Sequence, residues 1–116
     1  MAENNTENIV IIWTTRDGEV FKELIYPYVL NSKTQGWWKE VTLVIWGPSD
    51  QTLVENDDII DNIEELLAAR VKIEACRACA ENYGVSEQML KLGIEVKYMG
   101  SPTTAYLKTG AHVLTF

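Results

Sequence analysis

The chain has 116 residues, of which 47% are apolar and 23% charged, and its net charge is −7. This length predicts one domain whose core needs neither a disulfide nor a metal to stay folded. The Lys and Arg residues are scattered singly, whereas a phosphate backbone is bound by clustered cations, so we expect no nucleic-acid partner. We also expect no membrane partner, because the sequence holds no basic amphipathic helix and no apolar run of roughly 20 residues.

Residues 1–8 are polar and acidic, and we expect them to be a disordered segment ahead of a single domain at residues 9–116. They contain neither the basic region nor the cleavage pattern of a signal peptide, which predicts a cytoplasmic protein. Thiols in the cytoplasm are kept reduced, so Cys76 and Cys79 are expected to be free thiols.

Five short apolar runs predict β-strands. The runs at 9–13 and 41–46 are continuous, which is typical of strands buried on both faces in the middle of a parallel sheet. The runs at 71–75 and 94–98 alternate with charged residues, so we expect each to have one wetter face, toward a sheet edge or under a thinner helical cover. The run at 111–115 ends the chain.

Helical spacing of apolar residues separates these strands. The first helix is predicted over 17–33, with Asp17 as its N-cap and a kink or interruption at Pro27. Ser86 is predicted to cap a later helix. Strands that alternate with helices favour a parallel sheet in a three-layer α/β/α sandwich. The remaining helices are predicted at 57–67, at 76–83 with a stop near Gly84, at 87–92 with a stop at Gly93, and at 103–108.

Functional sites in such sheets form outside the carboxyl ends of the strands. Four segments are predicted to meet there, namely 14–17, 47–50, 76–79 and 100–103. The third segment is the most informative, because Cys76 stands where a strand passes into a helix. Helix N-terminal amides and the neighbouring Arg77 would stabilise a thiolate, while Glu74 and Glu81 act in the opposite direction.

Cys79 follows Cys76 by about one helical turn, close enough to form a disulfide with it or to receive a sulfur from it. The alternative for either cysteine is a small buried apolar residue, and this alternative suits Cys79, on a helix among alanines, better than Cys76. A structural zinc site needs four ligands, and the chain offers only His112 beyond the pair, so we expect no metal and no other cofactor.

Weaker candidates lie in the first two turns. Thr14 and Arg16 are candidate pocket residues, and Arg16 is suited either to an anion or substrate or to a surface ion pair. Trp46 and Trp13 end the two central strands and either line a pocket or pack in the core. The adjacent pair Trp37-Trp38 is suited to covering the sheet edge or to a subunit contact.

The segment at 75–85 places Gly84-Val85 eight residues after Cys76. In this spacing the chain resembles the small DsrE/DsrF-like proteins of sulfur metabolism, whose relatives include the TusD sulfur-relay subunits. The resemblance implies a five-stranded parallel α/β/α sandwich that assembles into trimers or hexamers. It also implies that Cys76 accepts sulfane sulfur as a persulfide from a donor protein and passes it to an acceptor protein. Cys79 stands where many relatives have alanine.

Three functions stay open from the sequence. The first is a sulfur carrier that acts through Cys76. The second is a thiol–disulfide oxidoreductase that uses Cys76 and Cys79 together. The third is a binding or assembly module without enzymatic activity, suggested by the one-sided strands and by Trp37-Trp38.

Overall fold

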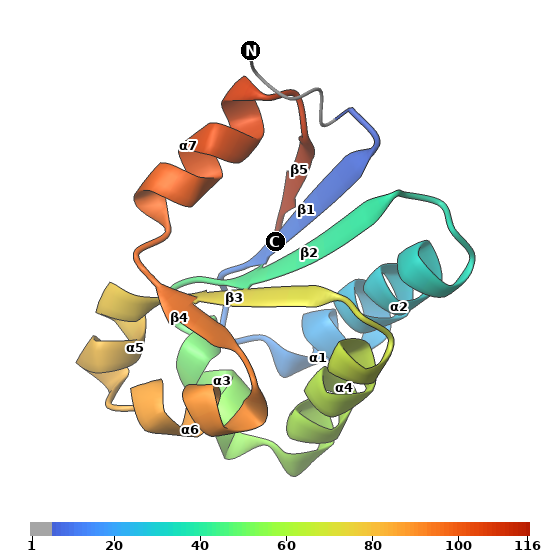
Figure 1. The fold of residues 1–116 in the computed structure, drawn as a ribbon. Coiled ribbons are helices and arrows are strands. Elements are labelled where there is room, and N and C mark those ends of the chain that lie inside the picture. Colours follow the sequence, from blue (N-terminus) through green and yellow to red (C-terminus); the bar gives the residue numbers. More distant parts are fainter. Residues whose placement is uncertain (1–5) are drawn as a thin grey trace.

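The computed structural model describes residues 6–116 and contains one sheet of five strands (Figure 1). The strand order is β4-β3-β2-β1-β5, and every neighbouring pair is parallel. The five-stranded parallel sheet is therefore confirmed. Of the expected N-terminal segment, residues 1–5 lie outside the described residues. The strands are β1 Asn8–Trp13, β2 Glu40–Ile45, β3 Lys72–Cys76, β4 Glu95–Lys97 and β5 His112–Thr115.

Helices cover the two faces of the sheet unequally. The helices that precede α7 gather on one face, where they bury the larger apolar core. The other face is covered by α7, which stands apart from the other helices (Figure 1). The helices are α1 Gly18–Val20, η1 Phe21–Ile25, α2 Tyr26–Thr34, α3 Ser49–Glu55, α4 Asp57–Ala68, α5 Arg77–Tyr83, α6 Ser86–Leu92 and α7 Gly100–Lys108.

The first predicted helix is present but interrupted. The Asp17 carboxylate accepts hydrogen bonds from the amides of Glu19 and Val20, at 3.0 and 3.2 Å, so the predicted N-cap is confirmed. The next turn, η1, is a π-helix, and α2 begins just before Pro27. A proline inside a helix lacks the amide that would bond the preceding turn, which accounts for the interruption at this point.

Two local predictions are wrong. Alternation predicted that Glu74 lies on a wetter face of β3, yet Glu74 is fully buried, because α7 covers that face and supplies a polar partner. Ser86 is not a cap but the first residue of α6, and Val85 occupies the cap position without a side-chain bond. In addition, α3 was not predicted, since its short span shows little helical periodicity.

The second tryptophan of the Trp37-Trp38 pair covers the β5 edge of the sheet. The Trp38 indole N–H donates to the Tyr28 hydroxyl at 3.0 Å, and the Trp38 ring lies 5.2 Å from that of His112 in β5. Trp37 stays 57% exposed. Within residues 6–116, no helix is long and apolar enough to cross a membrane.

Candidate functional site

The two cysteines lie at the carboxyl end of β3. Cys76 is both the last residue of β3 and the N-cap residue of α5, so the strand passes into the helix without a loop. The helix ends at Gly84, whose positive φ of 69° suits glycine, as predicted. Cys76 is 5% exposed and belongs to the smaller apolar cluster on the α7 face of the sheet. Cys79 is half-buried against the same cluster.

The two thiols are in hydrogen-bond contact. Burial is the main cause that raises the pKa of the Cys79 thiol, and the hydrogen bond to Cys76 raises this pKa further. The backbone N–H of Gly47 points at the sulfur and lowers the pKa. The two thiols are therefore close enough for one to donate a hydrogen bond to the other.

The Gly47 amide is held in place by the end of β1. The loop that contains it is anchored through the Trp46 amide, which donates to the Trp13 carbonyl at 3.1 Å, and through the Ser49 hydroxyl, which donates to the same carbonyl at 2.6 Å. Gly47 has a φ of 95°, a conformation that residues with a Cβ rarely adopt. The glycine thus lets the loop turn so that its amide reaches Cys79.

Asp50 is the functional candidate that sequence analysis missed. Its side chain is 0% exposed, and neither carboxylate oxygen has a hydrogen-bond partner among residues 6–116. Burial raises the pKa of Asp50 to about 7, and its charge in turn raises the pKa of Cys79. The segment 47–50 was predicted to reach this edge, but a sequence gives no sign that an aspartate at the start of a helix is buried without a partner.

Among the other predicted site residues, Trp46 alone packs against the apolar cluster that holds both cysteines. Arg77 points elsewhere, since its guanidinium pairs with Glu81 at 2.7 Å and lies 5.5 Å from the ring of Tyr98. A hydrogen bond to Glu81 raises the pKa of Arg77 and holds its charge at the surface.

The two candidates in the first turn do not reach the sulfur atoms either. The Thr14 hydroxyl donates to the carbonyl of Phe116 at 3.0 Å and so joins β1 to the end of the chain. Arg16 donates to the Gln51 side chain at 2.5 Å and stacks 5.6 Å from the Tyr83 ring. Through these hydrogen bonds, Thr14 connects the end of β1 to the end of the chain, and Arg16 connects the first turn to α3.

A second polar cluster lies on the same face of β3 as Cys76. Its centre is the buried Glu74 carboxylate, which accepts a hydrogen bond from the Tyr106 hydroxyl and forms an ion pair with Lys97. Lys72 approaches the same carboxylate at 3.7 Å. In the register of β3 and β4, Lys97 stands directly opposite Cys76. The hydrogen bond to Glu74 raises the pKa of Lys97 and keeps it charged.

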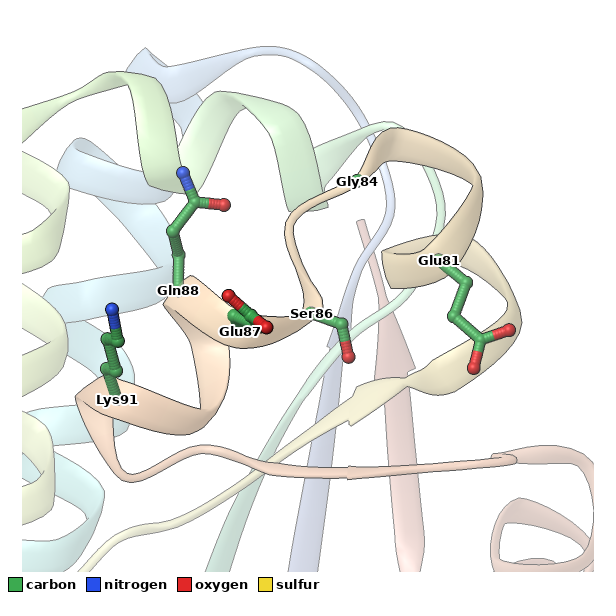
Figure 2. A pocket seen from close by; sticks show the side chains of 6 residues that line it. All are labelled: Glu81, Gly84, Ser86, Glu87, Gln88 and Lys91. Atoms are coloured by element: carbon green, nitrogen blue, oxygen red, sulfur yellow. The ribbon is translucent and has the colours of Figure 1, made fainter.

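A broad hollow of about 540 Å³ lies between the end of α5 and α6 (Figure 2). It is lined by Glu81, Gly84, Ser86, Glu87, Gln88 and Lys91. In Figure 2 the side chains of Glu81 and Gln88 point in different directions rather than toward one centre. The hollow does not include the cysteines, so we assign it no part in their chemistry. Within residues 6–116, no group of three His, Cys, Asp or Glu side chains is placed to hold a metal ion.

Comparison with known proteins agrees with this architecture. Residues 29–116 match the family model described as the DsrE/DsrF-like family. A solved structure of a conserved protein of unknown function from Bacteroides thetaiotaomicron is 37% identical, with a TM-score of 0.93 and full coverage of both chains. No curated protein matches the chain. The family match and the shared fold establish that this chain belongs to the DsrE/DsrF-like family.

Proposed function

We propose that this protein is a sulfur-relay protein in which Cys76 carries sulfane sulfur as a persulfide between a donor and an acceptor protein. The observation that carries the proposal is the contact of the Cys79 thiol with the Cys76 sulfur at the end of β3. Family membership and the retained spacing from Cys76 to Gly84-Val85 support it. The proposed setting is the cytoplasm, where both thiols stay reduced.

The proposed transfer moves one sulfur atom between thiolates. The Cys76 thiolate attacks the outer sulfur of a donor persulfide, the donor S–S bond breaks, and the donor thiolate leaves with the electron pair. The acceptor thiolate then attacks the same sulfur atom and releases Cys76 as a thiolate. In both steps the hydrogen bond from Cys79 stabilises the negative sulfur of Cys76.

The burial of Cys76 limits which donors it can meet. With 5% of the residue exposed, its sulfur admits small sulfur species or an extended persulfide side chain rather than a flat protein surface. The half-buried Cys79 lies beside it, at the more open side of the pair.

Incubation with inorganic polysulfide followed by intact-mass measurement tests the carrier function. We expect a one-sulfur adduct on Cys79→Ser, the same adduct on the wild type at early times, and its loss from Cys76→Ser, because Cys76 is the proposed nucleophile. Cys79→Ser is the matched control for removal of one thiol. An unmodified wild type, or an equal adduct on Cys76→Ser, would contradict the proposal.

The same contact between the thiols favours a second candidate, a thiol–disulfide oxidoreductase. Two cysteines one turn apart can close a disulfide and reopen it. Reduction of insulin by the dithiol form, without any sulfur adduct in the polysulfide experiment, would favour this function over the relay.

We also propose that the protein forms a homo-oligomer through the β5 side of the sheet. An apolar hollow of about 260 Å³ lies there, lined by Ile11, Leu24, Ile25, Tyr28, Leu114 and Phe116. Leu24 and Leu114 are exposed, and β5 is an edge strand of the sheet. A second copy would bury this surface, and the trimers or hexamers implied by the resemblance agree with that.

Sedimentation of the wild type and of Leu114→Glu tests this surface. We expect an oligomer for the wild type and a smaller species for Leu114→Glu, because a carboxylate would have to be buried in the contact. Leu90→Glu, at an exposed leucine of α6, is the control. A wild type that sediments as a monomer, or two variants with equal effects, would exclude this interface.

A further inference from the structure

We infer that Asp50 is a positioning residue that exchanges a proton with Cys79 when Cys79 displaces the sulfur carried by Cys76. The inference rests on the proposed function for its natural substrate, the Cys76 persulfide. It assigns a role to a carboxyl group that the transfer described above does not use.

The first argument is that Asp50 is buried without any partner. An ionised carboxylate that is removed from water and lacks hydrogen bonds is strongly destabilised, so buried carboxylates are normally paired. Here both oxygens lack a partner in the part of the chain that the structure describes, although Asp50 is 0% exposed. Burying such a carboxyl group lowers the stability of the folded protein, and apolar packing gives no reason to keep it.

The second argument is the connection between Asp50 and the thiol pair. The Asp50 amide donates to the Gly47 carbonyl at 3.1 Å, and the Gly47 amide points at the Cys79 sulfur. The anchored loop therefore places the Gly47 amide at Cys79 and the Asp50 side chain three residues further along the chain. The charge of Asp50 also reaches Cys79, since it raises the pKa of that thiol.

The surrounding charges do not account for the state of Asp50. Burial is what raises its pKa to about 7, a value at which a carboxyl group both accepts and donates protons near neutrality. The helices in closest contact with α3 are α1, α4 and α5. Apart from Cys79, the ionisable groups on these helices and on the loop before α1 are exposed or half-buried: Arg16, Asp17, Glu19, Asp57, Asp58, Asp61, Glu64, Glu65, Arg77, Glu81 and Tyr83.

The proposed step is balanced in atoms and electrons. The Cys79 thiol gives its proton to the Asp50 carboxylate, and the Cys79 thiolate attacks the inner sulfur of the Cys76 persulfide. The bond to the outer sulfur breaks, and that sulfur leaves as hydrosulfide with the electron pair. Asp50 returns the proton, which gives hydrogen sulfide and a Cys76–Cys79 disulfide. The sulfane sulfur is reduced, and the two cysteines are oxidised.

The test uses hydroxyethyl disulfide and no sulfane donor, so it separates this inference from the proposed function. Closing the Cys76–Cys79 disulfide requires Cys79 to lose its proton, whichever thiol reacts first. We expect Asp50→Asn to slow closure at least tenfold near pH 7, measured by intact mass. The wild-type rate should rise through about pH 7, whereas the rate of the Asn variant should rise only above the usual thiol range of about 8.5, because burial still raises the pKa of Cys79.

Two further variants keep the test decisive. Asp50→Glu restores the carboxyl group and should recover most of the rate, which loss of shape alone would not permit. Asp57→Asn removes an exposed carboxylate from α4 and should leave the rate unchanged. If Asp50→Asn does not fold, Asp50→Ser supplies the same comparison. The inference would be overturned if Asp50→Asn closed the disulfide as fast as the wild type does. It would also be overturned if the variant closed the disulfide faster, with a pH profile that shows a single ionisation at lower pH.

Discussion

Replacing Lys97 with methionine is expected to lower the free energy of unfolding by about 3 kcal/mol, because it leaves a buried carboxylate without its closest cation. Glu74 is 0% exposed and would retain the Tyr106 hydroxyl and the more distant Lys72. Urea denaturation at neutral pH measures the loss. The hydrogen bond to Glu74 raises the pKa of Lys97, so this stabilisation is lost only as the pH rises above the usual lysine range.

Lys72→Met is the matched control for this prediction. The Lys72 side chain is 53% exposed and lies 3.7 Å from the same carboxylate, so its loss should cost less than about 1 kcal/mol. The double variant Glu74→Gln with Lys97→Met should recover part of the loss, since it removes the unpaired charge. Equal effects of Lys97→Met and Lys72→Met would show that the buried pair does not stabilise the fold.

The stability of the wild type is expected to fall between about pH 4 and pH 7, relative to that of Asp50→Asn. The folded protein holds the Asp50 proton up to a pKa of about 7, whereas the unfolded chain releases it near 3.8. A raised carboxyl pKa stabilises the fold below the unfolded value, and this stabilisation is lost as the pH rises through the folded value. At about 1.4 kcal/mol per pH unit, the change is on the order of 4 kcal/mol.

Urea denaturation at several pH values measures this difference. The amide of Asp50→Asn does not titrate, so the cost of burying it is the same at every pH. This cost therefore cancels when the stability of the variant is compared between pH values. Asp57→Asn, whose carboxylate is exposed, should follow the wild-type curve. Parallel curves for the wild type and Asp50→Asn would mean that Asp50 ionises in the folded protein as it does in the unfolded chain.

The elements of the fold could be predicted because they depend on local patterns. A continuous apolar run indicates a strand buried on both faces, and helical spacing of apolar residues indicates a helix buried on one face. Both patterns can be recognised from the order of the residues alone. Asp17 as a cap and Gly84 as a helix stop are likewise local, since each satisfies backbone groups a few residues away. The position of Cys76 at the end of β3 followed from the same reasoning.

The surroundings of Cys76 depended on contacts between distant segments. Glu74 was predicted to face water because alternation does not reveal whether a helix such as α7, supplying Tyr106, will cover a strand face. Arg77 was expected near the sulfur, but Glu81 and Tyr98 hold it at the surface.

The sequence by itself determined the sheet, its parallel connections and the placing of the thiol pair at a strand end, because local periodicity and capping specify them. Only the tertiary structure decided that the Gly47 amide faces Cys79 and that Asp50 is buried with no hydrogen-bond partner for its side chain among the described residues. The physical reason is that the burial of these groups arises where three separate chain segments meet. The residues of one segment do not show which of their groups the other two segments will shield from water.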